Sequence, residues 1–235
     1  MSRFALISAV VLASSPRLAA ADCMSMPLSA QVVTMAGAEI PKDGGILVAT
    51  MYGGREPTPK HEDPVRADWR LRGKSLTAPK IELYAPGLAV YRVAFGGAAA
   101  AELENDAHEV VATVKPSTAK LAAVPAPKVK SVVFSQTLSR HSRQAATATL
   151  TADPPVGAMA LVLVDARGKA TSWGGVAVGR TQSPYEHNDC AMLPNGTSAP
   201  NAGETVTMFW VMDDGRRSPA SKPVKVTGKA IAGEP

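Results

Sequence analysis

Residues 206–215 read VTMFWVMDDG, and this stretch decides the fold class. Large apolar residues stand at every second position of its first seven, which is the period of a β-strand. The following residues 213–215 (DDG) form a tight-turn sequence, because Asp-Gly tolerates the positive φ values that short hairpins require. Residues 165–169 (DARGK) place the same kind of turn between two other apolar runs. The stretch therefore predicts strands joined by hairpins, with Trp210 in the core.

Outward from this stretch, short apolar or alternating runs recur along the whole chain, with turn residues between them. One run with good helix formers, residues 98–104 (AAAAELE), is long enough for one or two helical turns only. We therefore expect an all-β protein. The expected strands lie near 31–35, 45–52, 66–72, 80–84, 88–95 and 108–115, and then near 128–135, 144–152, 158–164, 170–178, 204–212 and 216–227.

A proline-rich stretch, residues 116–127 (PSTAKLAAVPAP), separates these two sets of strands. Proline removes donors from a strand ladder and stiffens the chain, so residues 119–127 are expected to form a linker. The flanking units, residues 22–118 and 128–229, each have the size of one β-sandwich. We expect two such domains in tandem with separable hydrophobic cores, followed by a disordered tail at residues 230–235. A single sandwich of all twelve strands is the alternative.

The first residues of the chain predict export. Arg3 precedes an apolar run at residues 4–13 (FALISAVVLA), and residues 18–21 (LAAA) offer the small residues that signal peptidase recognises. This is the pattern of a secretory signal peptide, and the run is too short for a membrane anchor. We predict cleavage after Ala21, which leaves 235 − 21 = 214 residues in the periplasm or outside the cell.

The two cysteines, Cys23 and Cys190, are expected to form a disulfide in that oxidising compartment. The bond would connect the mature N-terminus with the second domain. A lipid anchor on Cys23 is the alternative, although Asp22 occupies the position where a lipobox requires a small residue.

Charge and motifs exclude several classes of function. Loss of residues 1–21 removes two arginines, so 23 basic residues stand against 20 acids and the net charge falls from +5 to +3. This excess is small and dispersed, and no basic run carries interleaved aromatic residues, so we expect no nucleic-acid partner. The chain lacks Gly-x-Ser-x-Gly, His-Glu-x-x-His and the complete penicillin-binding set of motifs. We therefore assign no catalytic residue and no cofactor.

Two long segments, residues 53–64 and 179–203, are expected to be irregular loops, where functional residues concentrate. The first holds His61 beside two acids, and the second holds His187 near Asp189. Neither histidine has a second histidine within ligand reach in sequence, so we predict no metal site at either. Met24 and Met26 beside Cys23 would suit Cu(I), but two thioethers make an incomplete ligand set.

Three residues are candidates for contact with a ligand. Trp173 is followed by Gly174-Gly175, and glycine lets a ligand or a backbone segment approach an aromatic face. Tyr185 and His187 lie in the second long segment. A sugar-stacking platform at Trp173 is one reading, and a core position for this residue is the other.

Two short motifs resemble known envelope proteins. Residues 40–48 (IPKDGGILV) resemble the opening of bacterial Ig-like envelope modules, in which a Pro-x-Asn/Asp-Gly turn precedes a buried strand. Residues 88–93 (LAVYRV), after Pro86-Gly87, resemble the Tyr-x-Val strand of the same modules. The resemblance covers residues 40–95 and implies Ig-like or fibronectin type III-like sandwiches. Length, leader and charge also resemble two-domain periplasmic pilus chaperones, whose paired basic anchor and strand motif are missing here.

Together these features lead us to expect a non-enzymatic, exported structural or protein-binding module of the bacterial cell envelope, with no membrane span in the mature chain. Its partner would be an envelope protein or glycan that the sequence does not identify. A carbohydrate- or peptidoglycan-binding module is one alternative. A metal-dependent enzyme or metal carrier is the other.

Overall fold

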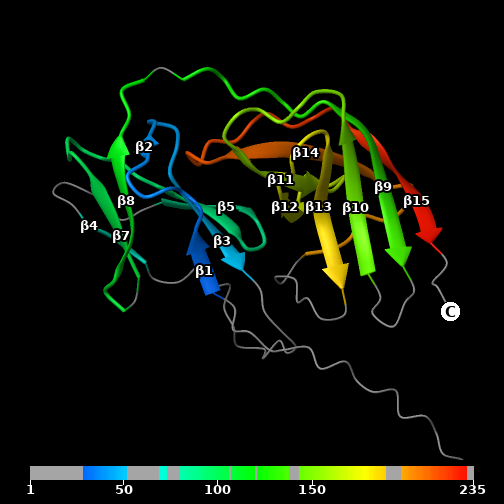
Figure 1. Cartoon of the computed structure of the whole chain (residues 1–235), viewed down its shortest axis with the longest axis horizontal. Coiled ribbons are helices and arrows are strands. Elements are labelled where there is room, and N and C mark those ends of the chain that lie inside the picture. Colours follow the sequence, from blue (N-terminus) through cyan, green and yellow to red (C-terminus); the bar gives the residue numbers. More distant parts are fainter. Residues whose placement is uncertain are drawn as a thin grey trace, which may run out of the picture.

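The computed structural model describes residues 29–51, 69–72, 80–105, 107–119, 121–137, 143–188 and 197–231. These residues form strands and turns and contain no helix, so the expected all-β class is confirmed for this part of the chain. We call residues 29–116 the first half and residues 129–231 the second half. Figure 1 shows them side by side, connected by a long extended segment.

The first half contains two four-stranded sheets. The inner sheet has the order β1-β3-β6-β5 and the outer sheet the order β2-β8-β7-β4, with β2 parallel to β8 and the other pairs antiparallel. Their strands are β1 (Ser29–Val32), β2 (Glu39–Ile40), β3 (Ile46–Met51), β4 (Arg70–Arg72), β5 (Lys80–Ala85), β6 (Leu88–Arg92), β7 (Ala101–Glu104) and β8 (Val110–Pro116).

The second half is one curled seven-stranded sheet with the order β12-β11-β14-β15-β9-β10-β13. Only β15 and β9 pair in parallel. The strands are β9 (Val129–Thr137), β10 (Arg143–Leu150), β11 (Ala158–Val164), β12 (Ala170–Gly175), β13 (Thr181–Asn188), β14 (Thr205–Met212) and β15 (Val224–Ile231).

The two edge strands of this sheet, β12 and β13, lie against each other. Gly174 in β12 makes this possible, because a Cβ atom there would overlap the backbone carbonyl of Ser183 in β13. The sheet therefore closes on itself as two facing layers. One layer holds β11, β12 and β14, and the other holds β9, β10, β13 and β15.

Three buried apolar clusters separate the layers. One lies between the two sheets of the first half and includes Ile46, Val48 and Tyr91. A second fills the second half and includes Leu161 and Trp210. The third takes residues from both halves, and we call it the junction core. Its buried members are Leu47, Ala49, Tyr84, Ala85, Leu88, Val90, Ala160, Val162, Val164, Phe209 and Val211.

Strands β3, β6, β11 and β14 are buried on both faces, which explains their nearly continuous apolar sequences. In β3, Ile46 and Val48 face the first-half cluster, whereas Leu47 and Ala49 face the junction core. β11 and β14 divide their side chains in the same alternating way between the second-half cluster and the junction core. A strand alternates apolar and polar residues only when one face meets water, so these strands show little polar alternation.

Residues 98–104, the run with good helix formers, do not form a helix. β7 begins at Ala101, and Ala101 and Leu103 are fully buried in the first-half cluster. Pairing of β7 with β4 and β8 buries these two side chains together. A run this short gains little from helix propensity, so the tertiary contacts decide its conformation.

Two further expectations on the second half are wrong. Residues 181–188, expected inside an irregular loop, form β13 and pair with β10. The last strand starts at Val224 instead of residue 216 and reaches Ile231, so residues 230 and 231, expected in the tail, pair with β9. Before β15, Ser218 and Ser221 hydrogen-bond to the backbone of β14 through both main chain and side chain.

Several expectations lie outside the described residues. They are the leader at residues 1–21, both cysteines, Met24 and Met26, His61 with its neighbouring acids, and the tail beyond residue 231. The connecting residues 117–119 and 121–128 contain no strand. The division of the chain into two domains stays a prediction, and the junction core is a feature that the sequence did not predict.

Candidate functional site

The junction core brings buried apolar side chains of the two halves into contact. Strands β3, β5 and β6 supply one wall, and β11 and β14 supply the other. Tyr84 and Phe209 meet across it with ring centroids 6.1 Å apart and perpendicular planes. This edge-to-face geometry adds to the stabilisation that burial of the two rings provides.

The turn after β14 inserts into the first half. The backbone amide of Gly45 donates to the carbonyl of Asp214 over 2.8 Å, and Thr34 Oγ1 donates to the carbonyl of Asp213 over 3.1 Å. A Cβ atom at Gly44 would overlap the carbonyl oxygen of Asp214. Two glycine-containing turns, which the sequence places about 170 residues apart, therefore lie in direct backbone contact.

A chain of polar side chains continues this contact. Arg92 pairs with the Glu82 carboxylate through Nε (3.0 Å) and Nη2 (2.8 Å), and Nη2 also donates to the Tyr84 hydroxyl over 2.6 Å. The Tyr84 hydroxyl in turn donates to the carbonyl of Gly215 in the second half over 2.7 Å. Arg92 thus orders the tyrosine that joins the two halves.

The pKa values of this group fit its role. Hydrogen bonds from Arg92 and Lys80 lower the pKa of the Glu82 carboxyl, so it stays ionised at neutral pH. Burial raises the pKa of the Tyr84 phenol, so its hydroxyl keeps the proton that it donates to Gly215. The ionised pair of Glu82 and Arg92 positions the Tyr84 hydroxyl, and this hydroxyl donates across the junction to the second half.

Trp173, a candidate ligand-facing residue, lies at the edge of the same region. Its indole Nε1 donates to the carbonyl of Pro86 over 2.9 Å, and its ring packs against the junction core. The ring is half-buried. This placement joins the halves and gives no support to an open sugar-stacking platform. The glycine after Trp173 does admit a backbone segment, namely β13.

Tyr185 and His187 lie on β13. Neither residue takes part in the hydrogen bond between Trp173 and Pro86. Tyr185 is buried opposite Ala146, its hydroxyl is 3.4 Å from the amide oxygen of Gln144, and burial raises the pKa of its phenol. His187 pairs with Gln144 in the strand register, and its buried Nδ1 has no hydrogen-bond partner among the described residues. Neither residue forms a recognisable ligand site with the neighbours described.

The described residues contain neither a cluster of metal ligands nor a helix that could cross a membrane. Within them, no three His, Cys, Asp or Glu side chains come together as a metal site would require. The same part of the chain holds no helix of the length and hydropathy needed to cross a bilayer.

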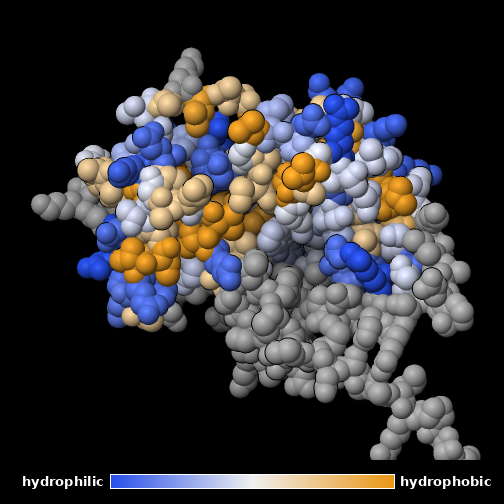
Figure 2. All heavy atoms as spheres, in the orientation of Figure 1, coloured by the Kyte–Doolittle hydropathy of each residue, from blue (hydrophilic) through white to orange (hydrophobic). Residues whose placement is uncertain are grey.

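The exposed apolar residues are scattered. Figure 2 shows several separate apolar areas on one face, the larger of them over the region where Figure 1 places β5 and its neighbours. On β5 itself, Ile81 and Leu83 remain 41% and 44% exposed.

The sequence indicated the turns at residues 40–45 and 213–215 but gave no sign that these two turns contact each other.

Comparisons with known proteins add little. No protein-family model matches the chain, and no curated protein matches it either. Among solved structures, one described as "Biofilm associated protein - BSP domain" is similar, at 12% identity with a TM-score of 0.26. The match covers 85% of this chain and 29% of that one, so this chain spans less than a third of its length. A similarity of this size supports no conclusion about fold or function.

Proposed function

We propose that this chain is an exported, non-enzymatic structural or protein-binding module of the bacterial cell envelope, built from two Ig-like sandwiches in a fixed arrangement. The observation that carries the proposal is the junction core, in which both halves bury apolar side chains against each other. Such a core favours a rigid two-part body over two hinged domains.

The strand order of the first half supports the Ig-like assignment. If β1 and β2 are lettered A and A′, and β3 to β8 are lettered B to G, the inner sheet reads A-B-E-D. The outer sheet then reads A′-G-F-C. The two sheets of an Ig constant-type domain hold strands A-B-E-D and C-F-G.

The second half supports the same assignment. With β9 to β15 lettered A, B, C, C′, E, F and G, the strand B pairs with E, and C pairs with both C′ and F. Strand G pairs briefly with F and at length with A. These are the neighbours of an Ig-like sandwich that has C′ in place of D.

Export rests on the leader at residues 1–21 and on the two cysteines. A Cys23–Cys190 disulfide would enclose 190 − 23 + 1 = 168 residues, and a covalent loop of this length contributes on the order of 2–5 kcal/mol to stability. Because it would connect the start of the mature chain with the second half, the bond would reinforce the junction.

Expression of the full chain in a bacterium tests the exported role. We expect a periplasmic or secreted product that begins at Asp22 and shows no free thiol after denaturation without reductant. A variant that lacks residues 2–21 is the control, and it should stay in the cytoplasm. An uncleaved full chain in the cytoplasmic fraction would contradict the proposal, and two free thiols in an exported product would remove the disulfide from it.

A further inference from the structure

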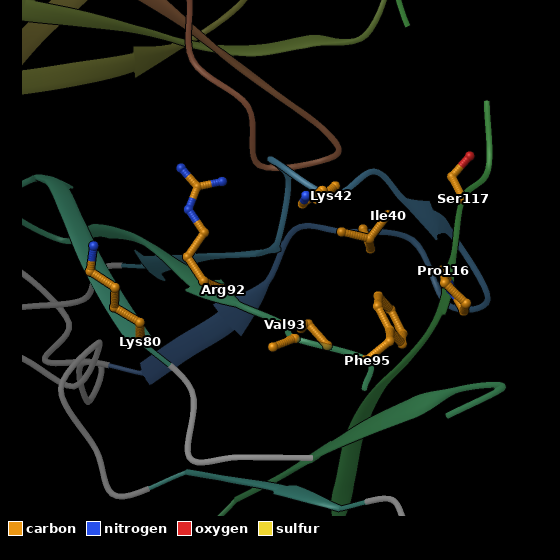
Figure 3. A pocket seen from close by; sticks show the side chains of 9 residues that line it. Ile40, Lys42, Lys80, Arg92, Val93, Phe95, Pro116 and Ser117 are labelled. Atoms are coloured by element: carbon orange, nitrogen blue, oxygen red, sulfur yellow. The ribbon is translucent and has the colours of Figure 1, made fainter. Parts of the chain in front are cut away.

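A hollow of about 480 Å³ opens at the end of the inner sheet, beside the junction. It lies where β6 ends, β5 begins and β8 leaves the outer sheet. This volume falls within the range of small-ligand sites and is large enough for one or two amino-acid side chains. Figure 3 shows the side chains around it. Its lining residues are Ile40, Lys42, Lys80, Arg92, Val93, Ala94, Phe95, Pro116 and Ser117.

The charged residues that line the hollow are all basic: Lys42, Lys80 and Arg92. One carboxylate, Glu82, accepts from both Lys80 (3.0 Å) and Arg92 (2.8 Å). The ion pairs of the described residues include none at Lys42. A second carboxylate, Glu39, accepts from the hydroxyl of the lining residue Ser117. Three cations against two anions leave one positive charge in excess, which favours a negatively charged ligand.

The remaining lining is mainly apolar. Ile40 and Val93 form buried walls, and the half-buried Phe95 ring stands beside them. The one hydroxyl, on Ser117, already donates to Glu39 over 3.2 Å. A sugar needs several hydrogen-bond partners for its hydroxyl groups, which this wall does not offer. The surface suits an apolar side chain next to a carboxylate.

We propose that this hollow binds a segment of a partner protein in which an apolar residue is flanked by acidic residues. The apolar side chain enters between Val93 and Phe95, and the acidic side chains pair with Lys42 and with the exposed ammonium group of Lys80. The inference deepens the proposed protein-binding role and rests on it. It names the chemistry of the partner and the place where the partner binds.

Three blocked tripeptides test this on the full mature chain: Ac-Asp-Phe-Asp-NH₂, Ac-Asp-Ser-Asp-NH₂ and Ac-Lys-Phe-Lys-NH₂. Binding is measured by NMR chemical-shift titration at low ionic strength. We expect the first peptide to bind at least about tenfold more tightly than the other two, with shifts concentrated at residues 92–95. Added salt should weaken it, because the charges are solvent-accessible.

Two variants locate the site. Lys42→Glu reverses an exposed charge and should weaken the first peptide about tenfold. Ala94→Trp, at an exposed position, fills the hollow and should weaken it by a similar factor. Lys130→Glu is the matched control on an exposed residue of β9 and should bind as the wild type does. Circular dichroism confirms that each variant is folded.

Equal binding of all three peptides, no binding at millimolar concentration, or binding that neither variant weakens would overturn the proposal. Preference for an acidic oligosaccharide, such as a galacturonate trimer, over the first peptide would also overturn it. None of these results alters the export test, so failure of this site and failure of the exported role can be told apart.

Discussion

Phe209→Ala should lower the free energy of unfolding by about 3–5 kcal/mol and the melting temperature by roughly 10 °C. The Phe209 ring is 4% exposed in the junction core. It meets Tyr84 edge to face, and the Arg217 guanidinium lies 4.8 Å from its centroid. Its removal leaves a cavity between two sheets that belong to different halves. Urea unfolding followed by circular dichroism measures the loss.

Phe134→Ala is the matched control for this variant. Phe134 lies on β9 at the far side of the second half, where its ring is only partly buried against the second-half cluster. Its removal should cost about half as much or less, because the surrounding chain and solvent can fill the space. If Phe209→Ala costs no more than Phe134→Ala, the ring is not held in a buried core shared by both halves.

Gly215→Ala is expected to have the second large effect, a loss of roughly 3 kcal/mol or more, measured by the same unfolding method. Gly215 has a φ of +77°, and non-glycine residues at such values pay a conformational cost of about 1–3 kcal/mol. A Cβ atom there would also lie 2.6 Å from the carbonyl oxygen of Gly45. The turn would have to move away from the first half, and the bond from Tyr84 to the Gly215 carbonyl would weaken.

Gly168→Ala separates these two causes. Gly168 also sits in a turn after an aspartate, with a φ of +80°, but nothing lies within 4 Å of its Cβ position. It should therefore pay the conformational cost alone, about 1 kcal/mol. The difference between the two variants measures the contact between the halves. Equal losses would mean that the turn at residues 213–215 tolerates a side chain and does not press on Gly45.

The sequence predicted those strands whose own residues form apolar runs bounded by turn sequences. The second-half strand expected at residues 158–164 has these bounds in the structure, and the run at residues 204–212 is β14 with one residue less. Both DxxG and DDG turns contain a glycine with positive φ, as their sequences indicate. Local turn chemistry and apolar periodicity decide these elements, so they can be read without knowledge of the tertiary structure.

Elements that depend on distant partners were missed. β7 has a helix-forming composition and becomes a strand because Ala101 and Leu103 complete a cluster formed by other strands. β13 contains Pro184 and six polar or charged residues, so its sequence gave no strand signal, and its pairing with β10 decides its conformation. Such contacts override local preference.

The junction core was missed for a related reason. β3, β11 and β14 showed more continuous apolar sequence than a strand with one solvent-exposed face requires, and this excess is the sign of a second buried face. The pattern was visible, but it does not identify what covers that face. The hollow beside the junction could not be predicted either, because its lining residues come from four separate stretches of the chain.

The central claim is that the two halves share one buried core and unfold as one unit. Differential scanning calorimetry of the full oxidised chain tests it most directly. We expect a single transition whose van't Hoff enthalpy equals the calorimetric enthalpy. Two separate transitions, of which one persists unchanged in a fragment of residues 126–235, would contradict the claim and favour two independent domains on a linker.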